Sequence, residues 1–566
     1  MAIMDDNLQS DSQKHNNEAA LEAVRQEFQL LLDSQTAQIQ RLADIGIALS
    51  AERDTDILLE MIIDEAMAFS NADAGTLYVV DYDRNELVFQ ILKNQTLKIH
   101  AGGTSGQAVT LPPVPLEIDG LANLTNASSQ AALTGEVINI PDVYEAIGLD
   151  FSGTKKYDAQ TGYRSKSMLV VPMKNHENEI IGVLQLLNAK VQGSDEVVPF
   201  PKNRETMIIS LASQAAVALE NARLIAGLQG LFDAFIESIA TAIDEKSAYT
   251  AGHIRRVAKL TMMIASQVNK SNAGVFEDTF FNEDEMEELR VAAWLHDVGK
   301  ITTPEYVVDK ATKLQGIFDR LELVEQRFAL IAAQMENATL QQKVQLLQSG
   351  NPDSGALQQL DDKLTAELAI LKSDLEFIAR CNLGFEFLDN ERLERIQRIS
   401  HKNFQLNGET HPYLTDDELK NLSIRKGTLT DSERKIIENH VLVSIKMLKQ
   451  VPFPRKMSKV PEYAGGHHEK LDGSGYPFGL TADQLALQSR IMAIADIFEA
   501  LTAKDRPYKK PMKLSQALSI LRDMCDRNHI DRDVFDLFMN SGEFMRYARE
   551  ELNQEQIDVE INKEKS

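Results

Sequence analysis

Two pairs of adjacent residues in the C-terminal half of the chain could perform metal chemistry. One pair consists of two histidines and the other of a histidine and an aspartate. The stretch GGHHEKLDGSGYP places His467 and His468 side by side before a carboxylate and a glycine-rich turn. The apolar run AAWLHDVGK contains His296 and Asp297, with Lys300 one helical turn beyond Asp297 on the same face. A buried histidine bonded to its neighbour would explain the His296–Asp297 pair alone. Imidazole and carboxylate groups are also ligands of iron, manganese and zinc.

Three further polar residues lie in the same helix-patterned region. They are His253 in YTAGHIRRV, His440 in IIENHVLVS and Asp496 in IMAIADIFEA. Asp496 and His296 each interrupt an apolar run, where an unpaired polar side chain costs about 2 kcal/mol or more. One shared metal site explains these polar residues better than a separate, unrelated reason for each of them would. Two ions about 3.5–4 Å apart, bridged by an aspartate, could activate water and neutralise a phosphodiester.

Length, charge and cysteine content limit the classes of function. A chain of 566 residues is long enough for several domains. The net charge of −26 argues against partners such as nucleic acid polymers or anionic membranes, so an anionic substrate needs local cations or metals. Only Cys381 and Cys525 occur, which excludes a disulfide framework and a cysteine zinc site. No stretch approaches the roughly 18 apolar residues of a membrane span and no signal peptide is evident, so we expect a cytoplasmic protein.

The pattern of apolar residues predicts a multidomain chain. The stretches AGTLYVVDYDRNELVFQI and SKSMLVVPMKNHENEIIGVLQLLNA each predict two strands around a polar turn. We expect an N-terminal helix (1–38), an α+β domain with an antiparallel sheet flanked by helices (39–200), a coiled-coil helix (201–245), an all-α domain (246–550) and a polar tail (551–566).

An apolar seam runs through the helix predicted at 201–245. Its members step by three and four residues from Ile208 to Ile239. This spacing favours a helix that joins the two domains and pairs with its copy in a homodimer. A helix that packs on its own domain is the alternative.

The all-α domain contains an insertion at about 315–424. One apolar seam begins at Ile317, a second ends at Ile378, and the turn SGNPDSG separates them. The pattern predicts an antiparallel helical hairpin. A dimer contact, a docking site for a partner protein and a lid all remain open as its role.

The motifs HDVGK and HHEKLDGSGYP together resemble the HD-GYP domain, a branch of the HD phosphohydrolase superfamily whose characterised members hydrolyse cyclic di-GMP. The resemblance covers about 246–314 and 425–530. It implies that Asp297 bridges two ions and that Lys300 contacts the scissile phosphate, which makes both catalytic. The metal ligands that it implies are His253, His296, Asp297, His440, His467, His468 and Asp496.

The same resemblance nominates residues for substrate binding. Gly475, Tyr476 and Pro477 complete the motif, and we expect its glycines to turn the backbone where side chains would obstruct a dinucleotide. The segment DRPYKK resembles a phosphate-contacting segment, which nominates Arg506 and Lys509. Solvated surface charge is the alternative for these two residues.

The resemblance also bears on the cofactor. It implies two divalent ions, with iron or manganese favoured over other transition metals. Some family members hold a third ion with a carboxylate one turn before the first histidine, where this chain has Tyr249. Two ions are therefore expected, although Glu245 lies only two turns away and leaves a third ion open.

The front domain resembles a GAF domain over about 39–225, on the helix–sheet–helix order and on TGYRSKSMLVVPM. The stretch FSGTKKYDAQTGY is similar to the ligand loop of GAF domains that bind cyclic nucleotides, which nominates Phe151 and Asp158. The Asn-Lys signature of that subgroup is absent upstream, and the lack of cysteine excludes a covalently attached bilin. A ligand sensor and a purely structural, dimerising domain remain equal alternatives.

These inferences predict a metal-dependent phosphodiesterase that opens cyclic di-GMP to linear pGpG, and onward to GMP, under control of the GAF domain. A 3′,3′-cyclic GMP-AMP phosphodiesterase is the alternative substrate assignment. A catalytically silent receptor for the cyclic dinucleotide is the alternative from another class. A nucleotide or alarmone hydrolase of the wider HD group is a third hypothesis, which the HHEKLDGSGYP motif disfavours.

Overall fold

The computed structural model describes residues 25–559 apart from 27, 30, 31, 34, 38, 247–251, 350–353, 385 and 505–510. The chain divides into two compact units, Met1–Leu231 and Phe232–Ser566. The long helix α5 (Lys202–Asp244) begins in the first unit and ends in the second. Each unit has its own apolar core.

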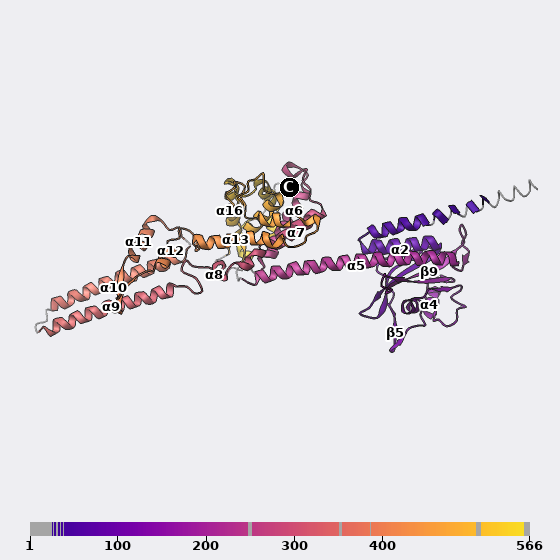
Figure 1. Ribbon diagram of the computed structural model, residues 1–566, viewed down its shortest axis with the longest axis horizontal. Helices are drawn as coiled ribbons and strands as arrows, with labels where there is room; N and C mark the ends of the chain where they lie inside the picture. Colours follow the sequence, from indigo (N-terminus) through magenta and orange to yellow (C-terminus); the bar gives the residue numbers. More distant parts are fainter. Residues whose placement is uncertain are drawn as a thin grey trace, which may run out of the picture. The chain divides into compact units, whose positions relative to one another are not determined.

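The first unit is built on an antiparallel sheet (Figure 1). Its strands follow the order β3-β2-β1-β9-β8-β7, with two-residue strands β4 and β10 at its margins. Both hairpins expected from the sequence are present, as β1–β2 and β8–β9. The main strands are β1 (Ala72–Asp81), β2 (Glu86–Asn94), β3 (Ile99–Gly102), β7 (Ile138–Ile140), β8 (Met168–Lys174) and β9 (Ile180–Lys190).

Helices cover both faces of this sheet. Helix α2 (Thr55–Ser70) and the first half of α5 pack on one face in a single apolar cluster. Helix α3 (Ala127–Thr134) packs on the other face, and α4 (Ser152–Thr161) lies in the connection to β8. The predicted α+β domain with an antiparallel sheet flanked by helices is therefore confirmed.

The apolar seam of α5 has a different environment in each part of the helix. Ile208, Leu211 and Ala215 are fully buried in the core of the first unit. The alternative interpretation, packing on its own domain, is therefore right for the first half of the seam. The boundary between the α+β domain and the coiled-coil helix was predicted at residue 200. In the structure the first half of α5 belongs to the first unit, because it covers the apolar face of the sheet.

Contrary to the expectation that no stretch approaches a membrane span, helix α5 is long and apolar enough, by length and composition alone, to cross a membrane. Residues before 223 pack in the first unit, and Ile236 and Ala240 are buried in the core of the second. Only residues 223–231 form a continuously exposed stretch. At 1.5 Å per residue this stretch is about 14 Å long, about half the thickness of a bilayer core. Its exposed side chains therefore suit a protein contact better than a bilayer.

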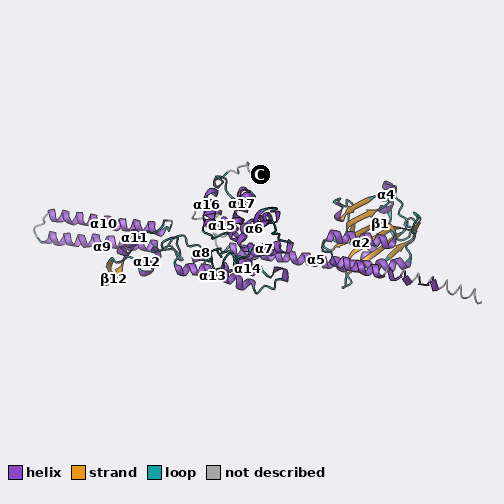
Figure 2. Ribbon diagram, turned by 90° about the horizontal axis from the view of Figure 1, so that it is seen from above, coloured by secondary structure: helices purple, strands orange, loops and turns teal. Residues whose placement is uncertain are grey.

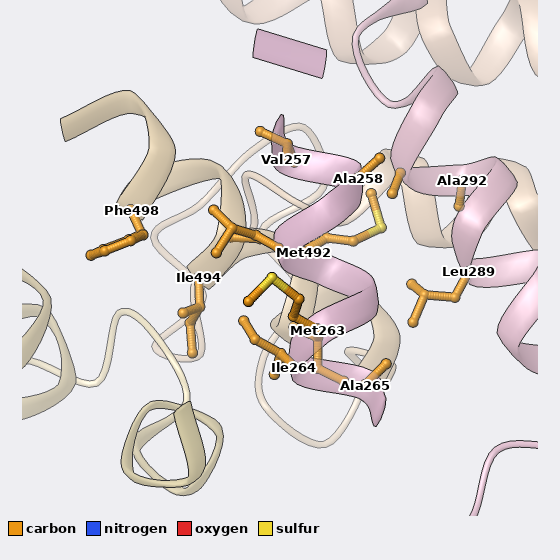
Figure 3. Packing of buried hydrophobic residues seen from close by; sticks show 14 of the residues in the cluster. Val257, Ala258, Met263, Ile264, Ala265, Leu289, Ala292, Met492, Ile494 and Phe498 are labelled. Carbon is orange, nitrogen blue, oxygen red and sulfur yellow. The ribbon is translucent and has the colours of Figure 1, made fainter. Parts of the chain in front are cut away.

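The second unit is almost entirely helical. Figure 3 shows its core, in which Met263 and Ile264 pack near Met492 and Ile494. Helix α13 begins at a capping box in which Thr430 and Glu433 bond reciprocally. The helices that carry the core and the polar residues discussed below are α6 (His253–Lys270), α7 (Glu283–Leu295), α13 (Asp431–Leu448), α14 (Val460–Gly465), α15 (Leu487–Thr502), α16 (Leu514–Asp526), α17 (Arg532–Asn540) and α18 (Glu543–Glu551).

Residues 313–425 form the insertion, which contains more than the predicted hairpin. Helices α9 (Leu321–Gln348) and α10 (Ser354–Asn382) lie side by side and antiparallel, as Figures 1 and 2 show. They are followed by α11 (Asn390–Ser400), by the hairpin of β11 (Asn403–Leu406) and β12 (Glu409–Pro412), and by α12 (Asp416–Leu422).

Two details of the insertion differ from the predicted seams. Ile317 is 96% exposed and precedes α9, so it does not belong to the first seam. The reason is that Lys313 and Leu314 donate their backbone N–H groups to Asn382, which holds this segment as a turn. Most of the predicted turn SGNPDSG lies outside the described residues.

Candidate metal centre

The seven residues predicted as ligands converge in the second unit. His253 begins α6, and His440 and Asp496 lie within α13 and α15. The other four directly follow helices, His296 and Asp297 after α7 and His467 and His468 after α14. Two groups of three residues could each hold an ion, because the ligand atoms within each group lie within 4.8 Å of one another. The first group is His253, His296 and Asp297. The second group is His440, His467 and His468.

Backbone carbonyls orient three of the histidines. The Nδ1 atoms of His296, His440 and His467 lie 2.7, 2.5 and 2.6 Å from the carbonyl oxygen three residues earlier. Because a carbonyl can only accept, each Nδ1 carries a proton, and in the neutral ring Nε2 then carries a lone pair. These three Nε2 atoms are buried and have no hydrogen-bond partner among the described residues. Such an arrangement is typical of metal-binding histidines.

Asp297 lies among these lone pairs. Its Oδ2 is 3.2 Å from His296 Nε2 and 3.5 Å from His253 Nε2, and its Oδ1 is 3.2 Å from His440 Nε2. For His296 and His440, whose Nε2 atoms have no hydrogen-bond partner among the described residues, an oxygen and an unprotonated nitrogen at this distance repel one another unless a cation lies between them. Metal bonds of about 2.1 Å bring neighbouring ligand atoms to about 3 Å apart, so the donor set fits a metal.

Asp496 spans the two groups in the same manner. Its Oδ1 lies 3.3 Å from His253 Nε2, and its Oδ2 lies 4.0 Å from His468 Nδ1. Asp297 and Asp496 thus each present one oxygen to the His253 side and the other to the His440–His468 side. The sequence nominated Asp297 alone as the residue between two ions.

The charges of the centre also suit metal binding. Burial lowers the pKa of His468 to about 4 and holds the pKa of His467 well below its usual range, with a further contribution from neighbouring imidazoles. Burial opposes ionisation of Asp297, but the positive charge of Lys300 and the neighbouring imidazoles outweigh it and hold the pKa of Asp297 well below its usual range. The lowered pKa values keep His467 and His468 neutral beside an ionised Asp297, which are the protonation states that metals require. Burial would lower the pKa of His253, but Glu499, Asp297 and Asp496 outweigh it and raise that pKa well above its usual value.

Lys300 lies at the edge of the centre. Its Nζ is 2.6 Å from Asp297 Oδ2, and 23% of its side chain is exposed. Burial alone would lower the pKa of Lys300, but Asp297 and Asp496 raise it above its ordinary value. The residue is therefore an ammonium ion at neutral pH, held beside the carboxylate and partly open to solvent.

Glu499 is a functional residue that the sequence analysis missed. Its carboxylate is 1% exposed, contacts His253 Nδ1 in a short hydrogen bond and accepts from Arg256 Nε at 2.7 Å. This contact leaves His253 Nε2 directed at Asp297 and Asp496. A signal was available, because Glu499 interrupts the same apolar run as Asp496, one turn further along α15.

The loop after His468 is held by its own backbone and by Glu469. The Glu469 carboxylate, 3% exposed, accepts from the N–H groups of Phe478 at 2.7 Å and Leu480 at 3.0 Å. A Cβ at Gly475 would lie 2.3 Å from the backbone nitrogen of Lys470. The loop's own backbone therefore already excludes a side chain at this glycine, and its expected role in leaving room for a dinucleotide stays a prediction.

Tyr476 extends the centre toward solvent. Its ring lies 4.8 Å from the His468 ring, centroid to centroid, with the planes 31° apart. Tyr476 and Pro477 are both half-buried. An aromatic ring stacked on a histidine of the centre gives this loop a flat apolar surface beside the metal site.

Gly299 positions α13 against the His-Asp pair. Its N–H donates to Ser444 Oγ at 2.8 Å, and a Cβ at this position would lie 2.0 Å from the carbonyl oxygen of His440. The residue in the HDVGK motif is therefore small so that the backbone bearing His440 can approach Asp297.

The remaining predicted residues lie elsewhere. Arg506, Lys509 and Tyr249 lie outside the described residues. Phe151 is buried in an apolar cluster of the first unit. Asp158 is 3% exposed, and its oxygens accept from the N–H and hydroxyl of Ser165 and from Tyr144. Both side chains thus already serve the fold, and a GAF ligand at them stays a prediction.

Comparison with known proteins places this geometry in context. Residues 54–219 match the family model of the GAF domain, and residues 250–369 and 416–534 match models of the HD domain. Over 119 residues the chain is 42% identical to the 3′3′-cGAMP-specific phosphodiesterase 1 of Vibrio cholerae, which is 21% of this chain and 27% of that protein. Over 147 residues it is 34% identical to a probable cyclic di-GMP phosphodiesterase of the same organism, which is 25% of this chain and 33% of that protein.

A third relative comes from another organism. The chain is 36% identical over 94 residues to a cyclic di-GMP phosphodiesterase of Thermotoga maritima, which is 17% of this chain and 25% of that protein. The chain thus spans about a quarter to a third of the length of these curated relatives. The matched domains agree with the resemblance found in the sequence, because a region that matches the GAF domain is followed by regions that match the HD domain.

Proposed function

We propose that this protein binds two divalent metal ions and hydrolyses a cyclic dinucleotide. One observation carries the proposal: two buried carboxylates, Asp297 and Asp496, each span two groups of histidine nitrogens, three of which have no partner among the described residues. Two cations would satisfy these acceptors. We favour iron or manganese for the ions because the ligands are imidazoles and carboxylates without thiolates.

The residues would have different roles at such a centre. His253 and His296 would hold one ion, His440 and the His467–His468 pair the other, and the two aspartates both. When bound, the ions supply activated water at neutral pH and neutralise the charge of a phosphodiester. Glu499 keeps the His253 ring directed at the aspartates. The Lys300 ammonium lies where it can donate to a phosphate oxygen that approaches Asp297.

The names of the relatives support the substrate class. Among them are enzymes specific for 3′3′-cGAMP and enzymes that act on cyclic di-GMP. We propose cyclic di-GMP as the substrate, with pGpG and then GMP as products, and 3′,3′-cyclic GMP-AMP as the alternative. Comparing the hydrolysis rates of both dinucleotides by one preparation decides between them, and equal rates would contradict specificity for either.

The deciding experiment measures metal content and cyclic di-GMP hydrolysis on one anaerobically purified preparation beside an Asp297→Ala variant. We expect about two ions per chain and turnover that the substitution abolishes. Bound metal with tight nucleotide binding and no turnover would instead support a catalytically silent receptor. Release of pyrophosphate from guanosine alarmones would support the wider HD group of hydrolases.

We also propose a cytoplasmic homodimer formed through α5. Leu224, Leu228, Leu231 and Phe235 are spaced by four, three and four residues, and each is at least 57% exposed. This spacing is that of a coiled-coil seam, and a second copy of the helix would cover it. Leu228→Glu should shift the mass measured by light scattering from dimer to monomer, whereas Gln229→Glu on another face should not. A monomeric wild-type chain would contradict this part of the proposal.

A further inference from the structure

A cavity of about 380 Å³ lies at the base of the insertion. It is formed where the C-terminal end of α10 meets the segment before α9 and the start of α11, and its apolar wall includes Phe377 and Leu388. None of the residues of the metal centre lines it. Its volume falls in the range of sites for small molecules.

Lys313 lines this cavity and is 1% exposed. Its Nζ donates to the carbonyl oxygens of Leu422 at 3.2 Å and Ile424 at 2.7 Å. No carboxylate in the described part of the chain forms an ion pair with it. An ammonium group has three protons, so these two carbonyls leave one donor and a whole positive charge unmatched. A buried charge without a counter-ion is costly, which makes an anion in this cavity favourable.

Two guanidinium groups add to this charge. Arg380 lines the cavity and forms no ion pair with any described residue. Arg392 lines it too, and is paired at 2.5 Å with Glu386, the one acidic residue among the described lining residues, and at 3.7 Å with Asp389, which does not line the cavity. The lining thus carries three cations and one carboxylate, in a chain whose net charge is −26. Such a local reversal of charge attracts anions.

We propose that this cavity binds a small oxyanion, that is, a carboxylate or phosphate group on a molecule no larger than a mononucleotide. Lys313 would contact the anion from the buried side and the two arginines from the rim, where their planar forks match oxyanion geometry. Phe377 and Leu388 would contact an apolar part of the ligand. If Lys313 instead serves only to cap the carbonyls at the end of α12, the cavity will show no saturable binding.

The two cysteines of the chain provide a local readout. Cys381 lines the cavity, whereas Cys525 is buried in the core of the HD domain. The rate at which iodoacetamide alkylates Cys381, followed by peptide mass, therefore reports whether the cavity is filled, and Cys525 serves as an internal reference. Binding of an anion at the metal centre would not protect Cys381, so the result does not depend on the proposed phosphodiesterase activity.

The experiment uses the full chain as purified, at constant ionic strength, with inorganic phosphate, succinate and guanosine monophosphate in separate arms. We expect at least one of them to slow alkylation of Cys381 about fivefold or more in a saturable manner. Protection by succinate alone identifies a carboxylate ligand, and protection by phosphate or the nucleotide alone identifies a phosphate ligand.

Variants separate a built site from general charge effects. Arg380→Gln should raise the anion concentration that gives half-maximal protection of Cys381 about tenfold or more. The variant should still fold, because Arg380 is exposed and has no ion pair with any described residue. Arg398→Gln, on an exposed part of α11, is the matched control and should leave protection unchanged. The absence of saturable protection in every arm, or equal protection in the Arg380→Gln variant and the wild type, overturns the proposal.

Discussion

Two buried aspartates, one in each unit, show what distinguishes a structural carboxylate from one that belongs to a site. Asp158 in the GAF domain and Asp297 in the HD domain are 3% and 1% exposed. The oxygens of Asp158 receive three hydrogen bonds, two from Ser165 and one from Tyr144. Those of Asp297 face the nitrogens of three histidines and a single ammonium group. Burial alone therefore does not identify a site, whereas an excess of acceptors over donors does.

The largest expected effect comes from removing the charge of Asp297 while keeping its size. Asp297→Asn should abolish binding of at least one ion and lower turnover of cyclic di-GMP by about 10³-fold or more, because several kcal/mol of charge stabilisation depend on the metal. Metal content by mass spectrometry and initial rates measure both effects.

The matching change in the GAF domain is Asp158→Asn, which is the control. It should destabilise the first unit by about 1–3 kcal/mol, because an amide group replaces an acceptor of three hydrogen bonds. Metal content should stay the same. Loss of metal in this variant, or retention of both ions in Asp297→Asn, would contradict the distinction between the two residues.

The second prediction separates metal binding from charge stabilisation at Asp297. Lys300→Met should retain both ions and lower turnover by about 10²-fold, because it removes a donor to developing phosphate charge and none of the ligands. Lys446→Met in α13 removes an exposed lysine outside the centre and should keep full activity. A Lys300→Met enzyme with wild-type turnover would remove Lys300 from the mechanism.

Glu499 provides an intermediate case, since it is a satisfied carboxylate like Asp158 but lies inside the metal centre. Glu499→Gln should weaken metal binding by about 10- to 100-fold, because a carboxylate behind a ligating histidine fixes the ring and raises its basicity. Competition with a chelator measures this affinity. Glu288→Gln, a buried glutamate that bonds the backbone of Lys459, is the control and should leave the affinity unchanged.

Sequence alone could predict most of the centre, because His296 and Asp496 interrupt apolar runs and the other ligands lie in recognisable motifs. Glu499 carries the same signal and could have been found. The double span of Asp297 and Asp496 could not, since it depends on how α7 and α15 are packed.

The helices and strands likewise divide into those that the sequence could predict and those that it could not. Apolar periodicity predicted α9 and α10, but the β11–β12 hairpin was missed although Asn407 and Gly408 form a typical hairpin turn with positive φ angles. Periodicity also could not tell whether α5 covers a sheet or a second helix, because both partners bury the same stripe.

The smallest expected effect concerns two glycines that allow close backbone approach, one in each unit. Gly299→Ala should cost about 1–3 kcal/mol and lower turnover, because the new Cβ would displace the backbone of His440. Gly182→Ala places a Cβ 2.4 Å from the carbonyl oxygen of Tyr78 in the GAF sheet, and should cost a similar amount without changing metal content. Thermal unfolding and metal analysis of both variants test this pair. Equal loss of metal in the two would show that global instability, and not the position of His440, is the cause.

The carbonyl contacts of His296, His440 and His467 have a consequence for how the centre is maintained. Each ring takes its proton position from a main-chain oxygen of its own helical turn, so no neighbouring side chain needs to be preserved for it. Sequence drift around these positions would leave the reactive nitrogen unchanged as long as the local turn persists.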